Sequence, residues 1–183
     1  QIAVGPFFPP FYHRIRQGIL DSILEADALL RPARAGYSRL NVPGLHQDRR
    51  CEDGINSDDS MGILKVTHDD QSLLAIVVNY AVHSTLIHNS QLILSKDISG
   101  AIELGIEQRL DHHAPVLYFQ SWAGDMSPII PNHQITNPGN EPRRDYPKLD
   151  AVGAEAASLI IPVIDAIETS DSLEIQAKNI RFP

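Results

Sequence analysis

The feature that most constrains the fold is a nearly continuous run of apolar residues over Leu74–Val82. A run of this length without alternation is typical of a β-strand that is covered on both faces. A second apolar segment, Gly62–Thr67, precedes it, and the polar residues His68–Gln71 lie between the two. This pattern predicts a β-hairpin, so at least part of the sheet should be antiparallel.

Helical and strand patterns alternate around this hairpin. Apolar residues at four-residue spacing from Tyr12 predict a first helix, which ends at Arg31-Pro32. The other predicted elements are a strand at Ala35–Val42, a helix at Gly100–Leu110, a strand at Pro115–Phe119, a helix at Leu149–Ile167 and a final strand at Leu173–Ile180, with long loops at Leu45–Ser60 and Pro128–Pro147. This order predicts a single α/β domain over residues 1–183, a layered α/β/α domain with a mixed β-sheet.

The composition excludes several classes of protein. With 183 residues, 43% hydrophobic and 21% charged, the chain has the composition of a soluble globular domain, and no stretch approaches the roughly 18 apolar residues of a membrane span. A net charge of −8 with scattered basic residues argues against nucleic-acid binding. The single cysteine, Cys51, excludes an internal disulfide but leaves the compartment open. No signal peptide or initiator Met opens the chain, and we expect both ends to be cut from a longer protein.

Polar residues follow two of the predicted buried strands. His83 comes after the first, and a histidine at a strand end can bind a metal or act as a base. Gly124, Asp125 and Ser127 come after the second, where a glycine lets the backbone approach a ligand and a serine can act as nucleophile or hydrogen-bond donor. A loop-bonded histidine and an ordinary turn are the structural alternatives.

Two further segments carry charged side chains. Asp97 is placed to cap the helix that follows it. Arg49 or Arg50 could clamp a carbonyl or an acidic group, although functionless surface arginines are common. His13, on a predicted helix, has no partner at metal spacing, and the pair His112-His113 is interpreted as a solvated pair in a loop. No metal, phosphate or nucleophile-elbow motif is present.

Five segments, in order, resemble the neutral ceramidase family, especially its divergent bacterial members. They are Leu30–Tyr37, Gly44–Arg50, Asn79–His83, Ser95–Gly100 and Gly124–Pro128, the last being similar to the family's Gly-Asp-x-Ser-Pro signature. The resemblance implies a zinc-dependent amidohydrolase that cleaves an acyl amide such as ceramide to fatty acid and sphingoid base. It also implies that His83 is a zinc ligand, that Ser127 is the active-site serine and that Arg49 or Arg50 contacts substrate together with Gly124 and Asp125.

The chain also departs from the family pattern. The His-Thr-His-Ser-Gly-Pro motif and the downstream Glu and Tyr of the zinc site are absent, and Ile129 stands where ceramidases usually have Asn. One histidine cannot hold a catalytic zinc, so we expect the isolated chain to be inactive. Two alternatives stay open: a catalytically inactive protein that binds lipid or glycan on the same fold, and a hydrolase of another amide or ester.

The resemblance also implies partners and location. The expected partner is a small-molecule lipid amide, with a role in sphingolipid metabolism and a peripheral membrane contact in the longer protein. No obligate protein partner and no nucleic acid are expected. Family members imply a secreted, periplasmic or cell-surface location.

Overall fold

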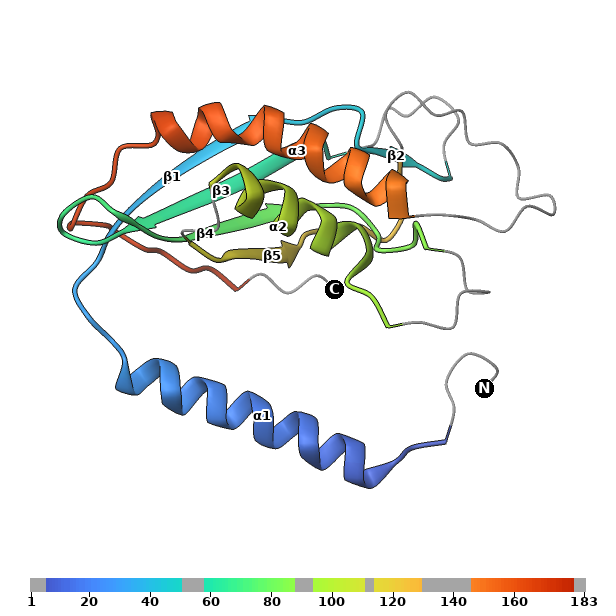
Figure 1. The fold of residues 1–183 in the computed structure, drawn as a ribbon, viewed down its shortest axis with the longest axis horizontal. Coiled ribbons are helices and arrows are strands. Elements are labelled where there is room, and N and C mark those ends of the chain that lie inside the picture. Colours follow the sequence, from blue (N-terminus) through green and yellow to red (C-terminus); the bar gives the residue numbers. More distant parts are fainter. Residues whose placement is uncertain (1–5, 51–57, 88–93, 111–113, 130–145, 180–183) are drawn as a thin grey trace. The chain divides into compact units, whose positions relative to one another are not determined.

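A computed structural model describes residues 6–50, 58–87, 94–110, 114–129 and 146–179 of the chain (Figure 1). The chain divides into two compact units, residues 1–32 and residues 33–183. The first unit contains helix α1, Pro9–Ala28. It begins before the predicted Tyr12 because proline is well tolerated in the first turn of a helix, where the N–H group has no intrahelical partner.

The second unit is built on a four-stranded sheet with the order β1-β3-β4-β5. The strands are β1 (Arg34–Asn41), β3 (Ser60–Thr67), β4 (Leu73–Tyr80) and β5 (Val116–Gln120). Strand β3 pairs antiparallel with both β1 and β4, whereas β5 pairs parallel with β4. The predicted hairpin and the predicted mixed sheet are therefore confirmed.

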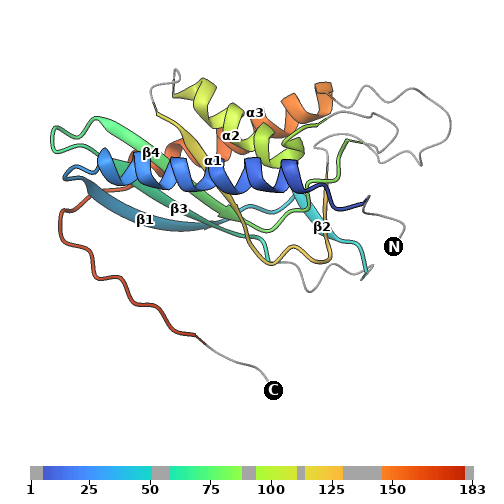
Figure 2. The same cartoon turned by 90° about the horizontal axis from the view of Figure 1, so that it is seen from below.

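Helices α2 (Asp97–Arg109) and α3 (Tyr146–Ala166) lie on the same face of this sheet (Figure 2). They approach each other at glycines: a Cβ atom on Gly105 would lie 2.2 Å from the carbonyl oxygen of Gly153. The predicted α/β class is confirmed. In the described part of the chain, no helix is long and apolar enough to cross a bilayer.

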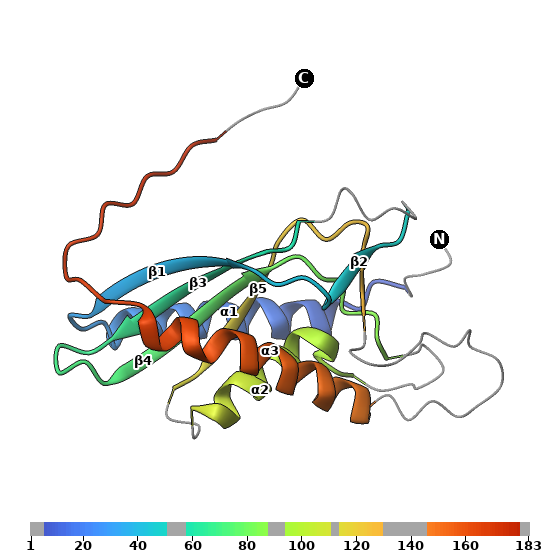
Figure 3. The same cartoon turned by 90° about the horizontal axis from the view of Figure 1, so that it is seen from above.

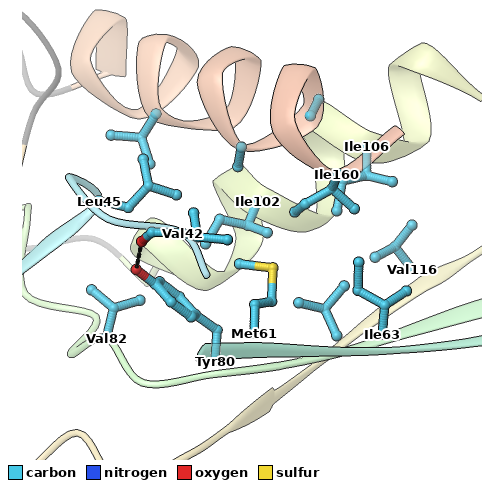
Figure 4. Packing of buried hydrophobic residues seen from close by; sticks show 14 of the residues in the cluster. Val42, Leu45, Met61, Ile63, Tyr80, Val82, Ile102, Ile106, Val116 and Ile160 are labelled. Carbon is cyan, nitrogen blue, oxygen red and sulfur yellow. Dashed lines mark hydrogen bonds between the residues drawn. The ribbon is translucent and has the colours of Figure 1, made fainter. Parts of the chain in front are cut away.

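The core lies between the sheet and these two helices (Figure 4). Ile76 and Val78 of β4 point into it and are fully buried, as are Ile102 and Ile160 of the two helices. Burial of each such side chain contributes about 2 kcal/mol. The sequence predicts that both faces of β4 are covered. Among the described residues of the second unit, helices α2 and α3 cover one face, and Asn79 on the other face is exposed.

A second, two-stranded sheet lies beyond the end of β1 (Figure 3). It pairs β2 (His46–Asp48) antiparallel with β6 (Met126–Pro128). β2 lies within the predicted loop Leu45–Ser60, so that prediction is wrong for these three residues, and β6 was not predicted as a strand. Three-residue strands are too short to show a period of two, and these two exist only because distant segments pair.

The predicted final strand at Leu173–Ile180 is also wrong for residues 173–179, which form no regular structure. One bridge, Ala35 with Ser170, ties the preceding residues to β1 in antiparallel register. Residues after Ser170 would therefore lie opposite residues before Ala35, where β1 has barely begun. Residue 180, most of the predicted loop Pro128–Pro147 and the pair His112-His113 lie outside the described residues.

Candidate functional site

The parallel pairing of β4 and β5 brings the two predicted strand-end segments together. Tyr80 and Gln120, the last residues of the two strands, are register partners, so both chains leave the sheet at the same edge. The N–H of Ser121 donates to the carbonyl of Tyr80 at 3.0 Å. Carboxyl ends of neighbouring parallel strands are where α/β proteins commonly build ligand sites.

His83 is held from two sides by the loop that follows β5. Its main-chain N–H donates to the carbonyl of Met126 at 2.9 Å, and its ring Nδ1 is hydrogen-bonded to the carbonyl of Ala123. A carbonyl oxygen only accepts, so Nδ1 carries the proton, and in the neutral ring Nε2 keeps its lone pair. Metal-binding histidines commonly have this arrangement, with the second ring nitrogen donating to a carbonyl.

The small sheet brings the arginine segment to the same loop. Gln47 lies opposite Ser127 in the β2–β6 ladder. Beyond the ladder, the main-chain N–H of Arg49 donates to the carbonyl of Asp125 at 2.9 Å, and its guanidinium Nη2 donates to the carbonyl of Gly124 at 2.9 Å. Segments 46–50 and His83, each singled out in the sequence, thus both contact segment 121–128.

The structure separates the two neighbouring arginines. The guanidinium of Arg49 contacts the loop after β5, whereas the main-chain N–H of Arg50 donates to Asp48 Oδ1 at 2.7 Å. The Asp48 side chain is buried, and both arginines are exposed. Arg49 is therefore the arginine whose guanidinium is bonded to the loop that leads into Ser127.

Gly124 is not required by the packing of the described residues. A Cβ atom placed on it would meet nothing within 4 Å, and its backbone does not have the left-handed φ that favours glycine. Ser127 is half-buried in β6. The open space beside Gly124 leaves room for a ligand next to the main chain.

One buried polar residue of this region was not predicted. The side chain of His46 in β2 is fully buried, and its Nε2 lies 3.0 Å from Asp59 Oδ1. Its ring stacks on Tyr80 with centroids 4.9 Å apart, and its buried Nδ1 has no hydrogen-bond partner among the described residues. The sequence gives no signal for this, because His46 stands in a polar segment with no periodicity.

Two tyrosines fix the end of β4. Burial raises the pKa of Tyr80 and that of Tyr118 above the ordinary value of about 10, and the carboxylate of Asp59 raises the pKa of Tyr80 further. Tyr80 donates its hydroxyl to the carbonyl of Val42 at 2.8 Å, and Tyr118 donates to the carbonyl of Tyr80 at 2.6 Å. Both hydroxyls therefore stay protonated donors at neutral pH.

The described residues fit a zinc site only in part. His83 fits as one ligand, with Nε2 available. Among the described side chains, no group of three His, Cys, Asp or Glu residues is placed to hold a metal ion. A catalytic zinc needs about three protein ligands. Any further ligands would have to come from outside the described residues.

The comparisons with known proteins show a fold. No known protein-family model matches the sequence, and no curated protein matches it. The structure is similar to neutral ceramidase from Pseudomonas aeruginosa, with a TM-score of 0.69 and 20% sequence identity over 83% of this chain and 26% of that one. It is also similar to a ceramidase complexed with C2, with a TM-score of 0.68 and 22% identity over 83% of this chain and 25% of that one. The chain has the neutral ceramidase fold and spans about a quarter of the length of these structures.

Proposed function

We propose that this chain is the central part of the catalytic domain of a zinc-dependent hydrolase that cleaves an acyl amide bond in a ceramide-like lipid. The observation that carries the proposal is the contact between segments 46–50, 83 and 121–128, which come from distant parts of the sequence. His83 and Arg49 both bond main-chain carbonyls of the loop that carries Gly124 and leads into Ser127. The likeness to ceramidase structures adds support at the level of fold.

In this proposal each side chain has a role that its position allows. Nε2 of His83 would be one ligand of the zinc ion, which supplies Lewis acidity and lowers the pKa of a bound water. Ser127 would act as nucleophile or as hydrogen-bond donor to the developing oxyanion. Arg49, held by the carbonyl of Gly124, would orient the substrate at the open side of that glycine.

The whole protein that carries this chain is needed for the reaction, since the described residues supply one candidate zinc ligand. The proposed substrate is a small lipid amide, with no obligate protein partner. Action on such a lipid fits a location outside the cytoplasm and a peripheral contact with a membrane.

The direct test is hydrolysis of N-acylsphingosine by the whole protein, wild type against Ser127→Ala. We expect release of fatty acid by the wild type and a loss of about 100-fold or more in the variant. Ser158→Ala is the matched control, because this serine lies exposed on α3 and its hydroxyl donates to the carbonyl of Glu155 in the same helix.

Other outcomes separate the alternatives. Hydrolysis of a different N-acyl amide or of an ester by the folded protein would support a hydrolase activity and reject the ceramide-like substrate. A folded, metal-loaded protein that hydrolyses no amide or ester would reject the proposal in favour of a protein that binds lipid or glycan without catalysis.

A further inference from the structure

Asp97 adopts a backbone conformation that ordinary helix capping does not explain. It is the first residue of α2 and has φ +53°, in the left-handed region, which non-glycine residues rarely adopt. Lys96 occupies the N-cap position and makes no side-chain capping bond. The simple cap predicted from the sequence is therefore only part of the role of Asp97.

The carboxylate of Asp97 binds three main-chain N–H groups, and two belong to a distant segment. It accepts from its neighbour Ile98 at 2.6 Å, from Leu86 at 3.0 Å and from Ile87 at 2.7 Å. The Asp97 side chain is buried, and hydrogen bonds of this kind to a charged carboxylate are strong. Asp97 therefore ties the N-terminus of α2 to the turn after β4.

That turn contains His83. On one side, the turn is bonded to the loop after β5, where His83 contacts Ala123 and Met126. On the other side, the turn is bonded to the start of α2, through Asp97 and through Ser99, whose hydroxyl accepts from that of Ser84 at 3.2 Å. The orientation of the His83 ring therefore depends on restraints from both sides of the turn.

Asp97 has a second possible use, which its bonding argues against. It also lines a groove of about 660 Å³ together with Gly100 and Gly153 of α2 and α3. The two oxygens of its carboxylate already accept from three N–H groups, so little acceptor capacity remains for a ligand in that groove.

We infer that Asp97 is a positioning residue of the candidate site: its carboxylate fixes residues 84–87 so that the His83 ring donates from Nδ1 to Ala123 and presents Nε2. The inference deepens the proposed function and rests on it for its biological meaning. Its geometric content, a dependence of the His83 ring on Asp97, can be measured without metal or turnover.

The test is Asp97→Asn in the whole protein, labelled with ¹⁵N-histidine and treated with a chelator. Asparagine has the same shape and tolerates a left-handed φ, so the variant is expected to fold, but its amide keeps a single acceptor oxygen. NMR reads the tautomer of the His83 ring, whose signals are assigned by their loss in His83→Gln. Hydrogen exchange read by mass spectrometry reports on residues 84–87.

We expect the wild-type ring to be the Nδ1–H tautomer and the Asp97→Asn ring to be a mixture, with exchange at residues 84–87 faster by about tenfold or more. Asp97→Gly, which removes the strain along with the carboxylate, should show the same change more strongly. Asp70→Asn is the matched control, because Asp70 also accepts from a turn N–H, that of Ser72 at 2.9 Å, in the hairpin before β4.

Three results would overturn the inference. A wild-type ring protonated on Nε2 would contradict the geometry. An unchanged His83 tautomer in Asp97→Asn, with or without faster exchange, would make Asp97 structural only. An equal change of the His83 tautomer in Asp70→Asn would show that the ring responds to any general loss of stability and not to Asp97 in particular. If the tautomer responds to Asp97 while the protein hydrolyses no amide, the inference holds and the proposed function fails.

Discussion

At the scale of single residues, the candidate site is organised by main-chain carbonyls of one loop. The carbonyl of Ala123 accepts from the ring of His83, and the carbonyl of Gly124 accepts from the guanidinium of Arg49. The orientation of both side chains therefore depends on the conformation of this loop. A change that leaves every functional side chain in place can still disturb the site by moving the loop.

Arg49 and Arg50 offer a paired test of this arrangement. Arg49→Ala removes the bond to the Gly124 carbonyl, and loss of a hydrogen bond from a charged group costs about 1.5–3 kcal/mol. We expect amide hydrolysis by the whole protein to fall about 10- to 100-fold in Arg49→Ala and to change little in Arg50→Ala. Equal losses in the two variants, measured as kcat/KM, would contradict the assignment of Arg49.

Gly124→Ala separates a role in ligand binding from a role in folding. The added methyl group meets no atom of the described residues within 4 Å and the backbone needs no left-handed φ, so stability should change by less than about 0.5 kcal/mol. A substrate lying against the main chain there would be displaced, raising KM about tenfold or more. Unchanged kinetics in a normally stable variant would show that substrate does not approach this glycine.

Tyr80 and Tyr118 predict a loss of stability in alkali. Their pKa values are raised in the folded state, so the unfolded chain loses these protons first as pH rises. The stabilisation is complete below the unfolded pKa of about 10 and is lost as pH rises through the higher folded value. Chemical denaturation at pH 8 and above pH 10 should therefore show a smaller drop in Tyr80→Phe than in wild type.

The exposed Tyr37 of β1 provides the control for this experiment. Tyr37→Phe should keep the wild-type drop in stability at high pH. At pH 8, Tyr80→Phe should itself be less stable by about 1 kcal/mol, because the bond to the carbonyl of Val42 is lost. A drop in Tyr80→Phe as large as that of wild type would argue against the burial of the Tyr80 hydroxyl.

At the scale of elements, the sequence predicts the long ones and misses the short ones. Strand β4 and its hairpin partner β3 are predicted from apolar runs separated by a polar turn. Helices α2 and α3 are predicted from their apolar periodicity, although both contain glycine. Strands β2 and β6 could not be predicted, because their ladder joins segments that are distant in the sequence. That ladder brings the arginine segment to the loop that leads into Ser127. The sequence singled out both segments but did not predict their contact.

The packing of α2 on α3 predicts a large effect for a small change. In Gly105→Ala the new Cβ would lie 2.2 Å from the carbonyl oxygen of Gly153. Alanine favours a helix by about 1 kcal/mol, but forcing two packed helices apart costs more, so we expect a net loss of about 1–3 kcal/mol in thermal or chemical unfolding. Gln108→Ala, exposed on the same helix, is the control; a Gly105→Ala variant as stable as this control would contradict the close approach.

At the scale of the whole molecule, the fold and the proposed function are supported by different observations. The resemblance of five short segments predicted the ceramidase fold, and the structure has it at only 20–22% identity with the matched ceramidases. Such conservation of fold is set by the pattern of buried positions, which tolerates many substitutions. The likeness spans about a quarter of the length of those structures and shows the fold alone.

The most direct test of the central claim is the zinc content of the whole protein, wild type against His83→Ala, by elemental analysis. We predict about one zinc per chain in the wild type, lost in His83→Ala and kept in His68→Ala, whose histidine lies in the β3–β4 hairpin at the opposite end of β4. Wild-type protein without zinc, or a His83→Ala variant that keeps its zinc, would contradict the claim that the ends of β4 and β5 form part of a zinc site.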